Sequence, residues 1–285
     1  MSIKIIQERL DSYHCASTQE EEQALREITQ EIALSALSRS GFFRAAAFHG
    51  GTALRIVHTL QRFSEDLDFM LMEPNRSFRW NPYLKNMSAE FEAYGFSIRI
   101  EDRSEADETV KKAFLKEDSI GKILLLKFPL RTGRPRQILI KFEVDTNPPM
   151  GSCFETKNLD FPFPFPVTVQ DLPSLFAGKC GALLCREYLK GRDWFDFVWY
   201  AARKPGLNFT LLSNALDQQG PWQGQRPQVT KKWFAGEMKR KIESIRWEEA
   251  KRDAERFLKP RELPTLQLWS AAFMLECLQK ILETL

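Results

Sequence analysis

The stretch FHGGTALRIVHTLQRFSEDLDFML, residues 48–71, places two glycines before an amphipathic segment and then sets acidic residues among apolar ones. Asp66 and Asp68 alternate with Leu67 and Phe69, which is the two-residue period of a β-strand. Alternate side chains of a strand share one face and lie about 7 Å apart. The pattern therefore predicts a strand that presents two carboxylates on one face and anchors its other face in a core.

Two carboxylates this close need a cation. They repel each other by roughly 1 kcal/mol in water and by about 4 kcal/mol at an intermediate dielectric. Magnesium, or manganese, suits the pair because such ions bind carboxylate and phosphate oxygens. Enzymes that transfer phosphoryl or nucleotidyl groups often hold two ions, and a third carboxylate from a neighbouring strand is then expected. Glu143, in the apolar stretch KFEVD (141–145), is the candidate, with Asp145 on the same face in reserve.

The glycines predict a place for an anionic group. A strand that ends at Gly50 and Gly51, followed by a helix that starts near Thr52, brings backbone N–H groups and a helix N-terminus together. Glycine has no Cβ to obstruct the approach, so a nucleoside triphosphate could be held between this turn and the acidic strand. Each feature alone also has an ordinary explanation. Gly-Gly-Thr is often only a tight turn, and Asp-x-Asp is often an exposed strand edge.

In this order, the features resemble the nucleotidyltransferase superfamily related to DNA polymerase beta. GGTALRI (50–56) followed by RFSEDLDF (62–69) is similar to the AbiEii family of abortive-infection and toxin–antitoxin nucleotidyltransferases, which includes the mycobacterial MenT toxins. The resemblance continues through LFAGKCGALLCREYLKGRDWFDF (175–197) and covers about residues 17–200. It implies a toxin that transfers nucleotides from a nucleoside triphosphate, with a cognate antitoxin and with the 3′ end of a tRNA as the expected acceptor.

The resemblance also assigns residues in the second half of the chain. Lys179 would contact phosphates and Asp193 would be the acidic residue of the second domain, with Arg192 and Asp196 beside it. Lys179 lies on an apolar helical stripe, where a charged group is costly unless it reaches a partner or water. The ordinary alternatives are a lysine whose head reaches solvent and a surface pair between Arg192 and Asp196.

Two residues just before the acidic strand are further candidates. Arg62 could meet a phosphate or form a salt bridge with Glu65 or another surface acid. Ser64 matches a serine that is phosphorylated in the MenT toxins. A phosphate on Ser64 would add negative charge beside the proposed metal and should block nucleotide binding.

The rest of the chain predicts an α/β protein in which a mixed sheet is followed by helices. Ser17 and Glu20 form a capping-box pattern before a helix over 18–39. Proline-containing stretches at 148–151 and 161–166 are expected to interrupt regular structure, and the pattern is helical beyond Asp171. We therefore predict a polymerase-beta-like nucleotidyltransferase domain over 1–168 and a helical domain over 169–285 that closes the active-site cleft. Further helices are expected over 52–60 and 82–95, and strands over 45–50, 66–72, 96–102, 122–130 and 137–145, the last two joined by a hairpin turn at 131–136.

Composition excludes several other classes of protein. The sequence has no run of about 20 apolar residues and no signal-peptide pattern at its start, so we expect a cytoplasmic protein without membrane contact. Five cysteines without close pairing and three histidines indicate neither a disulfide framework nor a zinc site. Lysine and arginine concentrate at 131–141 and 231–252, which are either solvated surfaces or contacts to nucleic acid.

Two other functions remain open from the sequence. The same fold could transfer the nucleotide to a protein hydroxyl, as AMPylating enzymes do. A non-catalytic module could instead use the cleft to bind nucleotide. Three strand carboxylates argue against the second alternative, because a site without a metal has no reason to hold them together. The sequence does not indicate the preferred base or the oligomeric state.

Overall fold

The chain divides into two compact units in a computed structural model that describes residues 2–102, 119–128 and 136–285. Unit 1 consists of Met1–Thr59, Phe63–Pro148 and Glu155–Val169, and unit 2 consists of Leu60–Arg62, Pro149–Phe154 and Gln170–Leu285. Most of the chain before about residue 168 thus packs in unit 1, and the chain after it packs in unit 2. Two short earlier segments, Leu60–Arg62 and Pro149–Phe154, also pack with unit 2. The role of the helical unit in closing a cleft stays a prediction.

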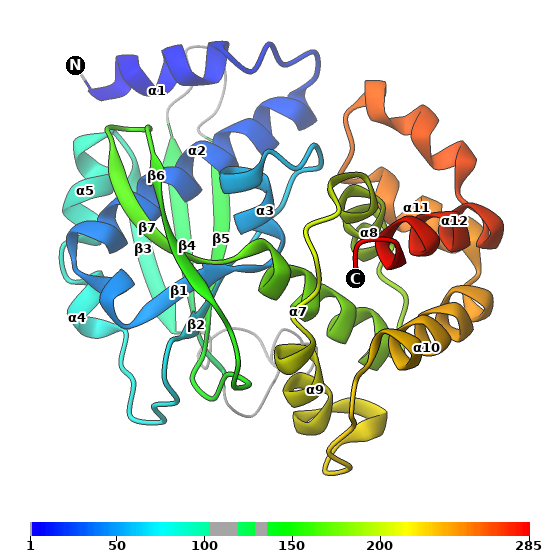
Figure 1. The fold of residues 1–285 in the computed structure, drawn as a ribbon. Coiled ribbons are helices and arrows are strands. Elements are labelled where there is room, and N and C mark those ends of the chain that lie inside the picture. The colour runs from blue at the N-terminus through cyan, green and yellow to red at the C-terminus, as the bar shows by residue number, and fades with distance from the viewer. Residues whose placement is uncertain (1, 103–118, 129–135) are drawn as a thin grey trace. The chain divides into compact units, whose positions relative to one another are not determined.

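Unit 1 is built on a seven-stranded mixed sheet with the order β3-β4-β5-β2-β1-β7-β6 (Figure 1). β2 runs parallel to β5 and β1 runs parallel to β7, whereas the pairs β1–β2, β3–β4 and β4–β5 are antiparallel. The predicted fold class, a mixed sheet followed by helices, is confirmed. The strands are β1 (Ala46–His49), β2 (Leu67–Leu71), β3 (Ser97–Asp102), β4 (Ser119–Phe128), β5 (Arg136–Asp145), β6 (Phe154–Leu159) and β7 (Phe165–Gln170).

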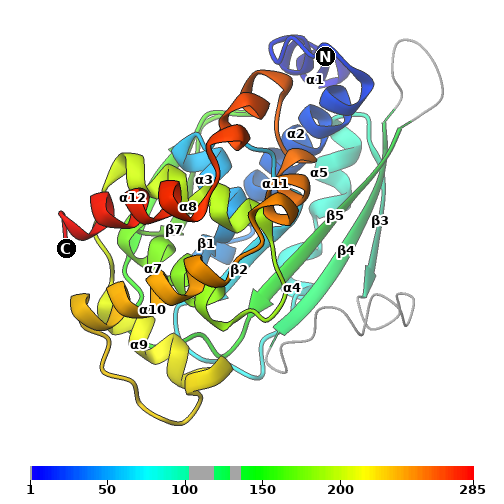
Figure 2. The ribbon, with the colours of Figure 1, turned by 90° about the vertical axis from the view of Figure 1, so that its right-hand side faces the viewer.

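The helices of unit 1 pack against this sheet. In Figure 2, α4 and α5 lie behind strands β3 to β5, and α2 contacts both α5 and β5. α2 begins where the sequence predicts, because the Ser17 side chain accepts a hydrogen bond from the Glu20 N–H at 3.2 Å. The carboxylate of Glu20 accepts in return from the N–H of Ala16, at 3.1 Å. The helices are α1 (Ser2–Asp11), α2 (Thr18–Arg39), α3 (Gly50–His58), α4 (Asn81–Leu84) and α5 (Met87–Ala93), with a short 3₁₀ turn, η1 (Phe42–Arg44).

An aromatic cluster fixes the central strands. Phe69 of β2 and Phe142 of β5 are buried with ring centroids 6.2 Å apart, and Phe42 stacks on Trp80 at 5.2 Å. Aromatic pairs at these distances add to the free energy of burial. Because strand residues alternate between faces, burying Phe69 and Phe142 on one face sends their neighbours Asp68 and Glu143 to the other.

Three elements differ from the sequence-based prediction. The helix expected over 82–95 is broken into α4 and α5 at a turn that includes Asn86. The proline-rich stretch at 161–166 leads directly into β7, which contains Pro166, and β6 precedes it, so sequence reasoning missed both strands. The predicted hairpin turn at 131–136 lies, except for its last residue, outside the described residues.

Unit 2 is helical, as predicted. Within the described ranges, every helix is too short or too polar to cross a lipid bilayer. The elements are α7 (Leu172–Cys185), α8 (Gly191–Arg203), α9 (Phe209–Gln218), α10 (Lys231–Ser244), α11 (Trp247–Glu255) and α12 (Ala271–Leu282), with 3₁₀ segments η2 (Gly220–Trp222) and η3 (Pro260–Leu268).

The start of α8 is held tightly against α11. A Cβ at Gly191 would lie 1.9 Å from the carbonyl oxygen of Ala250, so only glycine fits there. The N–H of Gly191 donates to the Asp253 carboxylate at 2.7 Å. This contact fixes the first turns of α8, which carry Asp193 and Asp196.

Candidate active site

The acidic face of unit 1 is formed by three adjacent strands. Asp68 of β2 is the register partner of His49 on β1 and of Glu143 on β5. Register partners point to the same face, and neighbouring strands lie about 4.8 Å apart. The structure therefore places Asp68 between His49 and Glu143, and Asp145 lies two residues further along β5.

The glycine turn lies directly against this face. Gly50 adopts a φ of +76°, in the left-handed region that favours glycine. A Cβ at this position would lie 2.7 Å from Oδ2 of Asp68. The close approach of Gly50 and Asp68 thus depends on the missing side chain, and α3 begins immediately at Gly50 and Gly51.

Thr52 connects α3 to the segment before the acidic strand. Its buried hydroxyl donates to the backbone carbonyl of Asp66 and lies 2.9 Å from Oγ of Ser64. Gln30 of α2 donates from its side-chain amide to the carbonyls of Ser64 and Glu65, at 3.2 and 2.9 Å. Asp66 lies just before β2, whose first residue is Leu67, so its position is set by these bonds rather than by the strand ladder.

The carboxylates do not form a complete metal centre by themselves. Residues 2–102, 119–128 and 136–285 contain no group of three or more His, Cys, Asp or Glu side chains that could hold a metal ion. What the register does bring together is the pair Asp68 and Glu143. The predicted three-carboxylate set of Asp66, Asp68 and Glu143 stays a prediction.

Unit 2 contains a second cluster of predicted residues, all of them charged and mostly buried. Arg62 donates from Nε and Nη2 to the two carboxylate oxygens of Asp196, each at 2.6 Å, and these side chains are 2% and 0% exposed. Lys179 lies between two acids, 2.6 Å from Asp193 and 2.7 Å from Asp196. Arg186 forms an ion pair with the other oxygen of Asp193.

This network shifts the pKa of its members. Burial alone would raise the pKa of Asp193, but the charges of Lys179 and Arg186 outweigh burial and hold that pKa well below its usual range. Burial alone would lower the pKa of Arg62, and the charge of Asp196 outweighs it, so that the pKa is raised. Asp193 and Arg62 are therefore charged at neutral pH.

The structure shows partners for several residues whose alternatives the sequence left open. The Lys179 ammonium is held by two acids instead of reaching solvent on its own. Glu65 forms a salt bridge with Arg26 at 3.0 Å, and Arg62 forms one with Asp196. Arg192 lies with its guanidinium 4.9 Å from the ring centroid of Phe257.

Sequence reasoning passed over two residues of these clusters. His49 belongs to the acidic face, and the available signal was its position beside Gly50 at the end of a short apolar strand. Arg186 follows the last residue of α7, one turn before α8, and nothing in its local pattern indicates that it pairs with Asp193.

Comparisons with known proteins agree with this arrangement at the level of the family. The model of a family described as "Nucleotidyl transferase AbiEii toxin, Type IV TA system" matches residues 32–275. A crystal structure of a proposed nucleotidyltransferase from H. pylori is 15% identical, with a TM-score of 0.48 over 90% of this chain and 92% of that one. A crystal structure of JHP933 from Helicobacter pylori is 14% identical, with a TM-score of 0.49 over 90% and 92%. No curated protein matches.

Proposed function

The chain belongs to the AbiEii family of nucleotidyltransferase toxins of type IV toxin–antitoxin systems, and on that premise we propose that it uses magnesium or manganese to transfer nucleotides from a nucleoside triphosphate to an RNA acceptor such as the 3′ end of a tRNA. A cognate antitoxin is the expected partner. The observation that carries the proposal is the contact between the glycine turn and the acidic strand. Gly50 leaves open the space beside Asp68, and Glu143 lies at the same register on β5.

The donor set of this face fits a divalent ion. Magnesium is usually bound through one or two carboxylates together with waters and substrate phosphates, and Asp68 and Glu143 supply two carboxylates from adjacent strands. Asp66, two residues before Asp68, is the third proposed ligand. When bound, the ion would neutralise charge that develops on the transferred phosphoryl group.

The protein's own residues have separate roles in this proposal. Gly50, Gly51 and Thr52 would offer backbone N–H groups of the first turn of α3 to the triphosphate. The hydroxyl of Thr52 is already bonded to the carbonyl of Asp66, so we assign that hydroxyl to holding the acidic segment. Glu143 would accept the proton of the attacking hydroxyl.

The charged residues of unit 2 are assigned to phosphate contact and to positioning. Lys179 stays the proposed phosphate contact. Because Asp193 and Asp196 hold its ammonium at 2.6 and 2.7 Å, a triphosphate would have to replace at least one of these acids as its partner. Arg62 and Asp196 form a buried pair, so we assign Arg62 to positioning rather than to direct phosphate contact. Ser64 lies 2.9 Å from Thr52, where a phosphate would disturb the glycine turn and repel the nucleotide.

The experiment is a labelling assay with purified protein, magnesium and each labelled nucleoside triphosphate, offered total tRNA and protein extract separately. We expect label in tRNA with the wild type, and at least about a hundredfold less with Asp68→Asn or Glu143→Gln, because each removes a ligand charge. Glu92→Gln, an exposed acid of unit 1, is the matched control and should retain full activity.

Each of the other outcomes has a definite meaning. Label in protein alone would replace the RNA acceptor with a protein hydroxyl. Undiminished labelling by both Asp68→Asn and Glu143→Gln would remove the acidic face from the reaction and contradict the proposal.

A further inference from the structure

Tyr200 of α8 carries a buried hydroxyl that the proposed roles above do not use. The residue is 0% exposed, and within residues 2–102, 119–128 and 136–285 its hydroxyl has no hydrogen-bond partner. Leaving a buried hydroxyl unbonded is unfavourable, so its presence needs an explanation. The ring stacks on Phe176 of α7 with centroids 4.4 Å apart, which holds the side chain in place.

The hydroxyl belongs to the face of α8 that carries Asp196. Tyr200 follows Asp196 by four residues, so both side chains lie on one face of the helix. Long side chains of a helix lean back toward its N-terminus, which turns the Tyr200 ring toward the turn of Asp196. Burial raises the pKa of Tyr200, and the charge of Asp196 raises it further. The phenol is thus within electrostatic reach of the Asp196 carboxylate.

Lys179 is shared by two acids that each have a second cation. Asp196 also pairs with Arg62, and Asp193 also pairs with Arg186. Stripping a buried charge of its only partner is strongly unfavourable. Because each acid keeps an arginine, Lys179 can leave both carboxylates without that cost.

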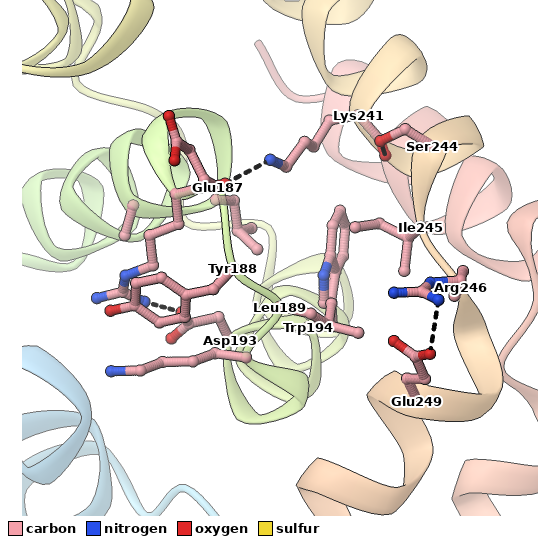
Figure 3. A pocket seen from close by; sticks show the side chains of 14 residues that line it. Glu187, Tyr188, Leu189, Asp193, Trp194, Lys241, Ser244, Ile245, Arg246 and Glu249 are labelled. Atoms are coloured by element: carbon pink, nitrogen blue, oxygen red, sulfur yellow. Dashed lines mark hydrogen bonds and ion pairs between the residues drawn. The ribbon is translucent and has the colours of Figure 1, made fainter. Parts of the chain in front are cut away.

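The two ends of this network differ in their access to water. Asp193 lines a pocket of about 400 Å³, where Figure 3 shows it on the same wall as Tyr188. Asp196 is 0% exposed. Water can therefore replace a bond that Lys179 gives up at Asp193. At the buried Asp196, the replacement has to come from the protein.

We propose that Tyr200 is a positioning residue whose hydroxyl donates to Oδ2 of Asp196 when Lys179 turns to the triphosphate. In the structure, Oδ2 accepts from Lys179 at 2.7 Å and from Arg62 at 2.6 Å. After the exchange it accepts from Arg62 and Tyr200, so the buried oxygen keeps two donors. The inference rests on the proposed phosphate contact of Lys179 and adds the group that replaces it.

The first measurement needs no nucleotide and follows thermal unfolding of full-length variants in a double-mutant cycle. Lys179→Met removes the lysine donor and imitates its departure, while Arg62 and Arg186 still pair with the two acids. In that background, Tyr200→Phe should lower the unfolding temperature by roughly 5 °C, because the hydroxyl is then bonded to a charged acceptor. In the wild type, Tyr200→Phe should not lower it, because no bond is lost.

Tyr188→Phe is the matched control, because it removes the same hydroxyl from a side chain of unit 2 that is 58% exposed. It should leave the unfolding temperature unchanged in both backgrounds. A loss by Tyr200→Phe that is as large in the wild type as in Lys179→Met would show that the hydroxyl is already bonded, and would overturn the inference. An unchanged unfolding temperature in both backgrounds would overturn it as well.

The second measurement is binding of ATP, GTP, CTP and UTP, each with magnesium and without acceptor, by isothermal titration calorimetry. Tyr200→Phe should bind the preferred triphosphate about tenfold or more weakly, although it is no less stable than the wild type. Tyr188→Phe should bind normally. If the wild type transfers label in a reaction that needs Asp68, but Tyr200→Phe binds as tightly as the wild type, this inference alone fails. If the wild type binds no triphosphate, the proposed function fails and the exchange fails with it.

Discussion

Gly50 shows how one backbone conformation decides the geometry of the acidic face. Any other residue would meet both a φ of +76° and the Oδ2 atom of Asp68, 2.7 Å from its Cβ. A left-handed conformation alone costs a non-glycine residue roughly 1 kcal/mol. We expect Gly50→Ala to lower the free energy of unfolding by about 1–2 kcal/mol and to reduce nucleotidyl transfer by about a hundredfold, because Asp68 is displaced. Urea denaturation and label transfer measure these two effects.

A glycine without these constraints provides the control. Gly236 lies inside α10, and a Cβ there would meet nothing closer than the Arg240 guanidinium at 3.9 Å. Gly236→Ala should raise the free energy of unfolding by up to about 1 kcal/mol, because alanine favours the helix, and should leave transfer unchanged. Equal losses of activity in the two variants would contradict the role of Gly50.

The pair Arg62 and Asp196 predicts a large effect on stability. Removing one partner leaves a buried charge without compensation, which typically costs 3–5 kcal/mol. We therefore expect Arg62→Met to lower the free energy of unfolding of unit 2 by about 3 kcal/mol. This value is at the low end of the range because Asp196 keeps its ion pair with Lys179. Lys239→Gln, which breaks an exposed 3.9 Å pair with Glu243, should cost less than about 1 kcal/mol. Similar costs for both variants would show that the buried pair contributes little.

At the scale of residues, the sequence predicts which face of a strand carries a side chain better than it predicts which distant residue that side chain contacts. Alternation in β2 and β5 was enough to propose Asp68 and Glu143 for one face, because the period of a strand is local. The bond between Arg62 and Asp196 joins residues 134 positions apart. Such a partner depends on how distant helices pack, which local periodicity does not contain.

At the scale of elements, the contact between α1 and α2 predicts a dependence on pH. Arg9 donates to Glu31 at 2.7 Å, and Tyr13 donates to Glu27 at 3.0 Å. Burial raises the pKa of Glu31 to about 7, against the lowering effect of Arg9. Between pH about 4.5 and 7, folded Glu31 therefore keeps a proton that the unfolded chain releases. The free energy of unfolding should fall as pH rises through this window, by about 3 kcal/mol.

The measurement is urea unfolding of unit 1 across that pH range, compared with Glu31→Gln. The variant cannot release a proton at position 31, so its stability should change less steeply with pH than that of the wild type. Identical pH profiles for the two proteins would show that Glu31 titrates normally in the folded state.

Elements with strong local signals could be predicted, and those that depend on the sheet could not. α2 extends over the predicted residues because Ser17 and Glu20 define its start. β7 was missed because proline was given more weight than alternation. Phe165, Val167 and Val169 are buried, while Pro166 lies on the exposed side, and the register with β1 pairs Val169 with Phe48, beyond the proline. Position 166 tolerates a residue without an N–H group because of where β7 pairs in the sheet, and that pairing cannot be predicted from the local sequence.

At the scale of the whole molecule, the candidate functional residues are divided between two units. Unit 1 carries the glycine turn and the acidic face, and unit 2 carries the charged network and the pocket beside Tyr188. The sequence indicates a change from strands to helices near residue 168. It gives no sign that Leu60–Arg62, between α3 and β2, packs with unit 2 and places Arg62 beside Asp196.

The central claim is that Asp68 and Glu143 hold a divalent ion next to Gly50. The most direct measurement is a crystal structure with manganese and a non-hydrolysable nucleoside triphosphate, in which anomalous scattering locates the metal. We predict a peak within about 2 Å of carboxylate oxygens of both Asp68 and Glu143, with the triphosphate against the first turn of α3. Manganese and triphosphate bound elsewhere, with neither carboxylate in contact, would contradict the account.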